Sequence, residues 1–300
     1  MNEQTDEPGS SKPKHKRRSL LCRLGRIAAV LGVVVIGMKL TGLGERLFYW
    51  PTRGQYAAPA GAEDVWFESE GRRLHGWFLP AVGVEPGDKA PTIVHTHGNA
   101  ANISRHLVFV DFLPREGFNV LIFDYRSYGR SEKGPLHRDG LINDALAAID
   151  YVMERPGVDP TRVGIYGLSL GGTIGIAAAA EDERVAAVCS VATFSTWKGV
   201  TGDYLPVLGP WLTRAGRDTV DTAAALGDRP LLLLHGTEDP IVSHRHAPII
   251  EAAAREAGVD VTFTSVDGAS HVDWIDSHPE MWRAIVEFFR EHLRTQQSNP

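Results

Sequence analysis

The 300-residue sequence has little cysteine, and its two cysteines lie in very different surroundings. Cys22 lies beside a basic segment and Cys189 lies in an apolar run typical of a strand, so no disulfide between them is expected. Clustered His and Cys residues, a Walker loop and a Gly-x-Gly-x-x-Gly motif are also lacking. We therefore expect chemistry that needs no metal and no other cofactor.

A surplus of positive charge is absent as well. Thirty-one Lys and Arg residues face 37 Asp and Glu residues, which gives a formal net charge of -6. Such a balance does not favour binding to a polyanion, so we expect no nucleic-acid partner. The sequence shows no internal repeat, and its length accommodates one catalytic domain of an α/β class with an N-terminal extension.

The N-terminal extension divides into three parts. Residues 1–26 are polar and then basic, which predicts a basic disordered tail. Residues 27–43 are nearly all apolar and predict a transmembrane anchor, a single-pass signal-anchor helix, followed by a linker over residues 44–62. The preceding Lys and Arg residues predict a cytoplasmic N-terminus and an extracytoplasmic catalytic domain. A cleaved signal peptide and a helix lying on the membrane surface are the alternatives.

Strand and helix patterns alternate over the predicted catalytic domain, residues 63–295. Residues 65–78 form two alternating runs joined near Gly71, which predicts a β-hairpin. Strand-length apolar runs then recur at 93–95, 120–123, 163–166, 185–191, 231–234 and 261–266. Helix-like segments separate them, so we expect an α/β fold with a mostly parallel sheet, helices on both faces and a binding site at the carboxyl ends of the strands.

A Gly-x-Ser-x-Gly motif centres on Ser169. The run before it is typical of a strand, and the glycine- and alanine-rich run after it is typical of a closely packed helix. This context predicts a sharp turn that exposes Ser169 as a nucleophile, with Gly167 and Gly171 leaving room for the turn. The alternative is a serine that only caps the start of a helix.

A serine nucleophile needs a base, and the base needs a carboxylate to orient it. Asp239 follows the run 231–234, and His271 follows the run 261–266, which places both at the edge of the sheet where Ser169 is expected. We therefore predict a catalytic triad of Ser169, Asp239 and His271. Glu238 is the competing acid. The competing bases, whose positions fit the role less well, are His235, His244, His246 and His278.

The segment His97-Gly98-Asn99-Ala100 directly follows the predicted strand at 93–95. An acyl-transfer site needs N–H donors for the oxygen that becomes negative during the reaction, and this fold takes one donor from such a loop and one from the residue after the nucleophile. We therefore predict that the backbone N–H groups of Asn99 and Leu170 form the oxyanion hole.

With these motifs, residues 45–290 resemble the α/β-hydrolase superfamily, and within it the membrane-anchored serine hydrolases with a small lid. The segments that carry the resemblance are RLFYWP at 46–51, THGNAANISR at 96–105, FDYRSYGRSE at 123–132, GLSLGG at 167–172, HGTEDPIV at 235–242 and GASH at 268–271. The resemblance implies an α/β-hydrolase fold with an eight-stranded sheet, and structural roles for Asp124, Arg126 and Gly129. The sequence departs from it at Ser127, usually Gly, and at Ser243, often Pro.

Residues 194–222 lie where this fold inserts its lid, and they are rich in Trp, Tyr, Leu and Val. They are expected either to line a pocket for an acyl group or to pack on the sheet as ordinary helix. The predicted function is a serine hydrolase that cleaves a carboxylic ester of a small molecule or lipid-like substrate through an acyl-enzyme. The alternatives are an acyl-thioesterase, a peptidase and, against the complete triad, a non-catalytic scaffold. The oligomeric state stays open.

Overall fold

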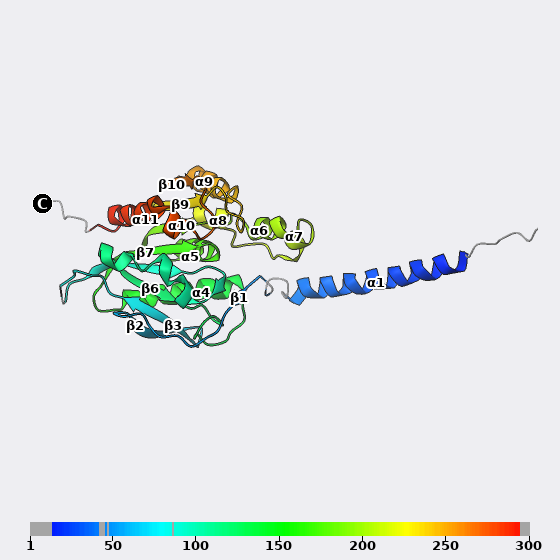
Figure 1. The fold of residues 1–300 in the computed structure, drawn as a ribbon, viewed down its shortest axis with the longest axis horizontal. Coiled ribbons are helices and arrows are strands. Elements are labelled where there is room, and N and C mark those ends of the chain that lie inside the picture. The colour runs from blue at the N-terminus through cyan, green and yellow to red at the C-terminus, as the bar shows by residue number, and fades with distance from the viewer. Residues whose placement is uncertain (1–13, 42–45, 47, 86, 295–300) are drawn as a thin grey trace, which may run out of the picture.

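A computed structural model of the chain describes residues 14–41, 46, 48–85 and 87–294. One eight-stranded sheet forms its centre, in the order β10-β9-β8-β7-β4-β6-β3-β2 (Figure 1). The strands are β2 (Glu63–Ser69), β3 (Arg72–Leu79), β4 (Ala90–Thr96), β6 (Asn119–Phe123), β7 (Val158–Leu168), β8 (Val185–Val191), β9 (Leu231–Gly236) and β10 (Val261–Val266). Only the β2–β3 and β3–β6 pairs are antiparallel, so the predicted fold class is confirmed.

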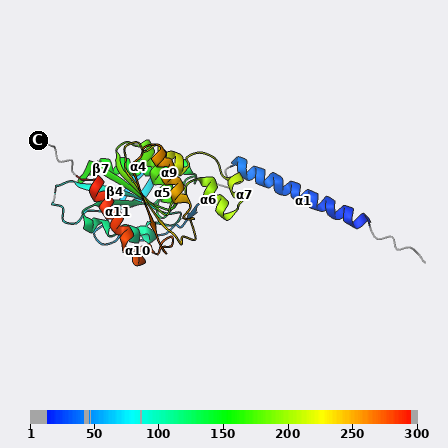
Figure 2. The ribbon, with the colours of Figure 1, turned by 90° about the horizontal axis from the view of Figure 1, so that it is seen from above.

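Helices cover both faces of the sheet, as Figure 2 shows. One face carries α4 (Arg138–Met153), α5 (Leu170–Glu181), α8 (Thr219–Ala224) and α9 (His246–Glu256). The other carries α3 (Ile103–His106), the short 3-10 helices η1 (Leu107–Phe109) and η2 (Leu113–Glu116), α10 (Trp274–Ser277) and α11 (Pro279–His292). Successive residues of a strand point to opposite faces, so Val94 joins the first buried cluster and Ile93 the second.

The central strands are buried on both faces, because helices lie above and below them. Every residue of β6 and of β9 is buried. This explains why their sequences are continuous apolar runs rather than alternating ones. The outer strand β2 alternates between exposed and buried positions, and it turns into β3 at Glu70 and Gly71, which both have positive φ. The predicted hairpin is therefore confirmed.

The prediction of a membrane anchor at residues 27–43 is wrong. Within the residues that the structure describes, no helix combines the length and the apolar character needed to cross a membrane. Helix α1 (Lys14–Thr41) carries charge at Arg26 and Lys39, and the 12 residues 27–38 between them rise only about 18 Å, against a hydrocarbon core of about 30 Å. The predicted single-pass topology, with a cytoplasmic N-terminus and an extracytoplasmic catalytic domain, is wrong for the same reason, and the membrane partner predicted from this run has no support among the described residues.

The first part of the extension also differs from its predicted form. Helix α1 begins at Lys14, so residues 14–26, predicted as part of a disordered tail, are helical. Residues 1–13 of the predicted tail and residues 42–43 of the predicted anchor lie outside the described residues. Figures 1 and 2 show α1 projecting from the end of the molecule near α6 (Trp197–Tyr204) and α7 (Leu208–Leu212).

The predicted linker over residues 44–62 contains a strand. Trp50 and Pro51 form β1 (Trp50–Pro51), which pairs in parallel with β5 (Ala100–Ala101) in a small two-stranded sheet. The partner strand belongs to the segment that carries the predicted oxyanion loop. This part of the extension is therefore attached to the edge of the catalytic domain where the predicted site lies.

Candidate active site

The four predicted site segments follow four parallel strands. Ser169 follows β7, Asp239 follows β9, His271 follows β10, and Asn99 follows β4. These strands lie within one run of the sheet, with β8 between β7 and β9. Since the carboxyl ends of parallel strands meet at one edge, the topology brings all four segments to that edge.

Ser169 occupies a strained one-residue turn. Strand β7 ends at Leu168, α5 begins at Leu170, and Ser169 between them has φ 56° and ψ -118°, which is unusual for any residue other than Gly. Its N–H donates to Val191 O at 2.8 Å, which fixes the turn against β8. Its side chain makes no capping hydrogen bond, so the alternative of a simple helix cap is not supported.

The glycines around Ser169 are required by close backbone packing. A methyl group built on Gly167 would lie 2.5 Å from Gly171 O, and one built on Gly171 would overlap the carbonyl oxygen of Thr96. The turn can therefore form only where both side chains are absent, as the motif predicts.

We expect Gly171→Ala to lower the free energy of unfolding by about 3 kcal/mol, because the new methyl group meets backbone atoms of β4 that cannot rotate away. Urea denaturation of wild type and variant measures the change. Gly54→Ala is the matched control, because a methyl group there meets only Tyr56 Cδ1 at 4.0 Å. Equal stability of the two variants would contradict this packing.

Asp239 and His271 are joined by a hydrogen bond. His271 Nδ1 lies 2.7 Å from Asp239 Oδ2, and because a carboxylate only accepts, the proton is on Nδ1 and Nε2 is left as the basic nitrogen. Asp239 Oδ1 accepts from the N–H groups of Ile241 and Val242 at 2.8 and 2.9 Å. Asp239 is buried, whereas the competing Glu238 is exposed.

His235 contacts the same carboxylate. Its Nε2 lies 3.2 Å from Asp239 Oδ2 and 2.9 Å from Val242 O, so the ring donates toward both. Burial raises the pKa of Asp239, but the hydrogen bonds from His235 and His271 outweigh burial and hold that pKa well below its usual range. From the sequence, His235 is predicted only as a candidate base that competes with His271. The i,i+4 spacing of His235 and Asp239 around the turn after β9 is the signal that points to their contact.

Ser169 lies against the predicted oxyanion loop. A methyl group built on Gly98 would lie 3.8 Å from Ser169 Cβ and 3.1 Å from His106 Cε1. Among the residues that the structure describes, the Ser169 side chain makes no hydrogen bond. The structure therefore shows the hydrogen bond between His271 and Asp239, whereas the hydrogen bond between Ser169 and His271 stays a prediction.

The predicted oxyanion loop begins with a buried histidine, His97. Burial, reinforced by nearby His106, lowers the pKa of His97 to about 3, so its ring is neutral at ordinary pH. His97 Nδ1 donates to Gly98 O at 2.7 Å. Leu170 is the first residue of α5, where the backbone N–H has no acceptor within the helix.

A second array of Ser, His and Asp includes two residues of the predicted lid, Ser195 and Asp203. His246 Nδ1 accepts from the N–H and the Oγ of Ser195 at 3.1 and 2.8 Å, and His246 Nε2 donates to Asp203 Oδ2 at 3.0 Å. Ser195 and His246 are only 3% and 1% exposed. Because both side chains are almost fully buried, a substrate cannot reach Ser195. The array instead ties α6, which carries Asp203, to the start of α9.

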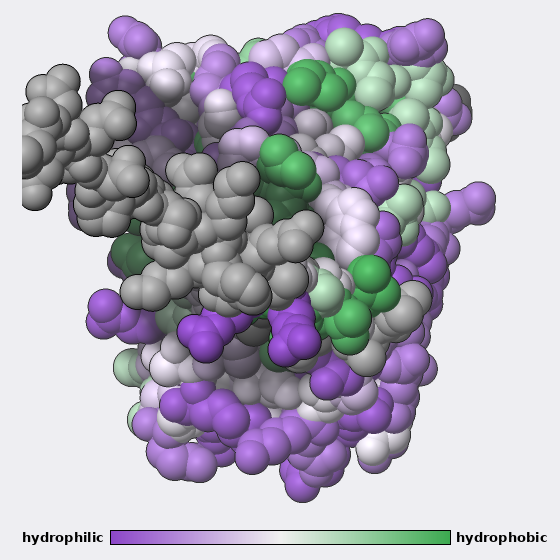
Figure 3. Space-filling view, turned by 90° about the vertical axis from the view of Figure 1, so that its right-hand side faces the viewer, coloured by the Kyte–Doolittle hydropathy of each residue, from purple (hydrophilic) through white to green (hydrophobic). Residues whose placement is uncertain are grey.

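The predicted lid, residues 194–222, has a buried and an exposed half. Trp197 and Val200 of α6 are buried in the core, while the apolar side chains that follow are exposed: Tyr204, Leu205, Val207, Leu208 and Trp211. Figure 3 looks at this end of the molecule and shows apolar areas set among polar ones. Tyr204 OH donates to Ile241 O at 2.5 Å, which joins the lid to the loop of Asp239. The buried half therefore packs on the sheet as one of the two predicted roles requires, and a role in lining an acyl pocket stays a prediction.

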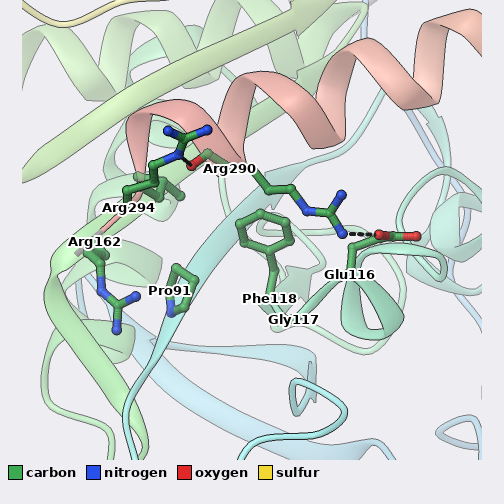
Figure 4. Close-up of a pocket in the computed structure, with 8 residues that line it drawn as sticks. Pro91, Glu116, Gly117, Phe118, Arg162, Arg290 and Arg294 are labelled. Carbon is green, nitrogen blue, oxygen red and sulfur yellow. Dashed lines mark hydrogen bonds and ion pairs between the residues drawn. The ribbon is translucent and has the colours of Figure 1, made fainter.

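A cavity of about 600 Å³ lies near the amino ends of β4, β6 and β7, away from these groups. It is lined by Pro91, Glu116, Gly117, Phe118, Arg162, Arg290, Leu293 and Arg294. Figure 4 shows the Arg290 guanidinium directed toward Glu116, to which it is ion-paired, and Arg162 is paired with Asp159. The cavity contains none of the predicted site residues.

The sheet, the strained serine between β7 and α5 and the Asp–His pair after β9 and β10 define an α/β hydrolase. Residues 110–296 match the model of the prolyl oligopeptidase family. The chain belongs to that family of α/β hydrolases. The narrower membrane-anchored subgroup that the motifs suggested is not supported by these matches.

Relatives align with most of the chain, and the name of one of them includes an alpha/beta hydrolase domain. The chain is 35% identical to the uncharacterized protein YfhR of Salmonella typhi, over 87% of this chain and 93% of the relative. It is 29% identical to the alpha/beta hydrolase domain-containing protein WAV2 of Arabidopsis thaliana, over 87% of this chain and 92% of the relative.

Solved structures of related fold include an esterase and a peptidase. The Pyrococcus furiosus esterase Pf2001 superposes with a TM-score of 0.67 at 21% identity, covering 81% of this chain and 97% of the esterase. The Pyrococcus horikoshii acylaminoacyl peptidase superposes with a TM-score of 0.63 at 20% identity, covering 80% of this chain and 43% of the peptidase. At these identities the likeness establishes the fold.

Proposed function

We propose that this protein is a serine hydrolase that cleaves carboxylic esters, with Ser169 as nucleophile, His271 as base and Asp239 as the carboxylate that orients the base. The observation that carries the proposal is the 2.7 Å hydrogen bond from His271 Nδ1 to Asp239 Oδ2, at the sheet edge where Ser169 occupies a strained turn. A neutral imidazole with its proton on Nδ1 is the form that can accept a proton from a serine.

The proposed reaction has two halves. Ser169 Oγ attacks the carbonyl carbon of the ester while its proton passes to His271 Nε2, and the N–H groups of Asn99 and Leu170 bind the oxygen that becomes negative. The intermediate collapses, the alcohol leaves with the proton from His271, and an acyl group remains on Ser169. Water then attacks the acyl-enzyme while His271 takes its proton. The bond between Ser169 Oγ and the acyl carbon breaks, His271 returns the proton to Oγ, and the acid is released.

The exposed apolar side chains of the lid support an ester with an apolar or lipid-like acyl group, because binding sites for such groups are lined mainly by apolar side chains. Peptide hydrolysis is the second candidate. The match to the prolyl oligopeptidase family and the likeness to an acylaminoacyl peptidase favour it. Acyl-thioesters would use the same groups, since only the leaving atom differs.

A substrate panel separates these candidates. We expect the full-length chain to hydrolyse p-nitrophenyl esters of graded acyl length with higher kcat/KM than the matching acyl-thioesters and peptide p-nitroanilides, because the apolar lid favours the acyl side of the substrate. Ser169→Ala controls for contaminating activity. A peptide substrate that is turned over faster than every ester would replace the esterase proposal with the peptidase one.

A further inference from the structure

The segment before the catalytic domain is built into the proposed site. Residues 48–53, here called the strap, cross the segment that carries the oxyanion loop. Trp50 pairs with Ala100 and Pro51 with Ala101, and Thr52 N–H donates to Ala101 O at 3.1 Å. The strap is therefore hydrogen-bonded to the chain directly after Asn99.

The Asn99 side chain is hydrogen-bonded to the strap. Its Nδ2 donates to Phe48 O at 2.6 Å, and its Oδ1 accepts from Trp50 N–H at 3.2 Å. The side-chain amide thus bonds the C=O of one strap residue and the N–H of the residue two further on, as the backbone of a neighbouring strand would. Tyr128 OH also lies 3.0 Å from Asn99 Oδ1. The residue proposed to supply the oxyanion N–H is held by its side chain as well as by its backbone.

Every carbonyl of the segment 97–101 accepts a hydrogen bond. The donors are Tyr125 OH to His97 O at 3.2 Å, His97 Nδ1 to Gly98 O at 2.7 Å, Tyr128 OH to Asn99 O at 2.7 Å, His106 Nε2 to Ala100 O at 2.9 Å and Thr52 N–H to Ala101 O at 3.1 Å. In a planar trans peptide the C=O and the next N–H point in opposite directions. Holding Gly98 O therefore sets the direction of the Asn99 N–H.

The strap also contacts the lid. The Phe48 ring packs edge-on against Phe194 and Trp197, with centroids 6.1 and 5.5 Å apart, and Trp197 is the first residue of α6. On its other side the strap is fixed to the loop after β6: Thr52 O accepts from Gly129 N–H at 3.1 Å, and Arg53 donates to Ser131 O at 2.7 Å. The strap therefore contacts the predicted lid, the loop after β6 and the Asn99 side chain.

We propose that the strap is a positioning element of the active site: it holds the Asn99 side chain and the Ala100–Ala101 backbone and, together with the bond from His97 to Gly98 O, aims the Asn99 N–H at the oxyanion. This inference rests on the proposed function. It assigns a role in turnover to a segment whose sequence predicts only a linker. A donor aimed at the transition state raises kcat without strengthening binding of the ground state, so loss of the strap contact changes kcat and leaves KM nearly unchanged.

The test compares two substitutions at one position in the full-length chain. Trp50→Pro removes the N–H that Asn99 Oδ1 accepts, whereas Trp50→Ala removes the exposed ring and keeps the N–H. We expect Trp50→Pro to lower kcat about a hundredfold, the scale expected when a reacting group is displaced by about 1 Å. Affinity for a trifluoromethyl ketone inhibitor should fall in parallel, while KM and the pH profile stay as in Trp50→Ala.

Asn99→Ala is the second variant, because it keeps the oxyanion N–H and removes both side-chain bonds to the strap. Asn143→Ala is its control, since Asn143 makes a surface hydrogen bond of 2.9 Å to Glu70. Thermal unfolding establishes that each variant is folded. Folded Asn99→Ala or Trp50→Pro protein with the kcat of its control overturns the strap proposal alone. Wild-type protein without hydrolase activity or phosphonate labelling overturns the proposed function as well.

Discussion

Replacing Ser169 by alanine lowers kcat for a p-nitrophenyl ester by about a millionfold, the scale of nucleophile removal in comparable serine hydrolases. The loss follows from the role proposed for Ser169, because alanine has no side-chain oxygen to attack the carbonyl. Burst and steady-state rates of matched preparations measure it. Thermal unfolding is expected to stay near that of wild type, because the side chain makes no hydrogen bond within the described residues.

Ser195→Ala is the matched control for this change. Ser195 also has a hydrogen-bonded His and Asp nearby, but Ser195 and His246 are almost fully buried, so a substrate cannot reach the serine. We expect Ser195→Ala to keep most of the activity. A large loss of kcat in Ser195→Ala together with a small loss of kcat in Ser169→Ala would show that Ser195 is the nucleophile.

Asp239→Asn lowers kcat by about ten-thousandfold while the protein stays folded. Asparagine has one accepting oxygen, and the N–H groups of Ile241 and Val242 already donate to that position, so its NH₂ group faces His271 and donates to Nδ1. The histidine proton then lies on Nε2, which can no longer act as the base. The imidazolium that forms during attack also loses its compensating charge. The kcat of the variant, with circular dichroism as a check on folding, measures the effect.

Glu238→Gln is the control at the neighbouring carboxylate. Glu238 is exposed and Asp239 is buried with four donors directed at its two oxygens. We expect Glu238→Gln to retain nearly the wild-type rate. The opposite order of damage would show that the wrong carboxylate was assigned.

The fold and the main groups of the site could be predicted because their signals are local. Gly167 and Gly171 mark a turn whose geometry depends on adjacent residues, and Asp239 and His271 each follow a recognisable strand directly. Because parallel strands align their carboxyl ends, the position of each residue directly after its strand is enough to predict that these residues lie at one edge of the sheet.

The contacts of the strap and of the array formed by Ser195, His246 and Asp203 could not be predicted in the same way. The bond from Asn99 to Phe48 joins residues 51 apart, and the bond from His246 to Asp203 joins residues 43 apart. No periodicity encodes such pairs. The prediction of a membrane anchor is wrong for a different reason: the predicted span extends past Lys39, although Arg26 and Lys39 leave only a short uncharged stretch of helix between them.

The most direct test of the central claim is to identify the residue that a fluorophosphonate modifies. The wild-type chain is treated with the reagent, digested and analysed by mass spectrometry, and loss of esterase activity is followed in the same samples. We predict one phosphonate adduct on the peptide that contains Ser169, at an occupancy that equals the fraction of activity lost, and no adduct in Ser169→Ala. Inactivation accompanied by an adduct on Ser195 or any other residue, with Ser169 unmodified, would contradict the proposed mechanism.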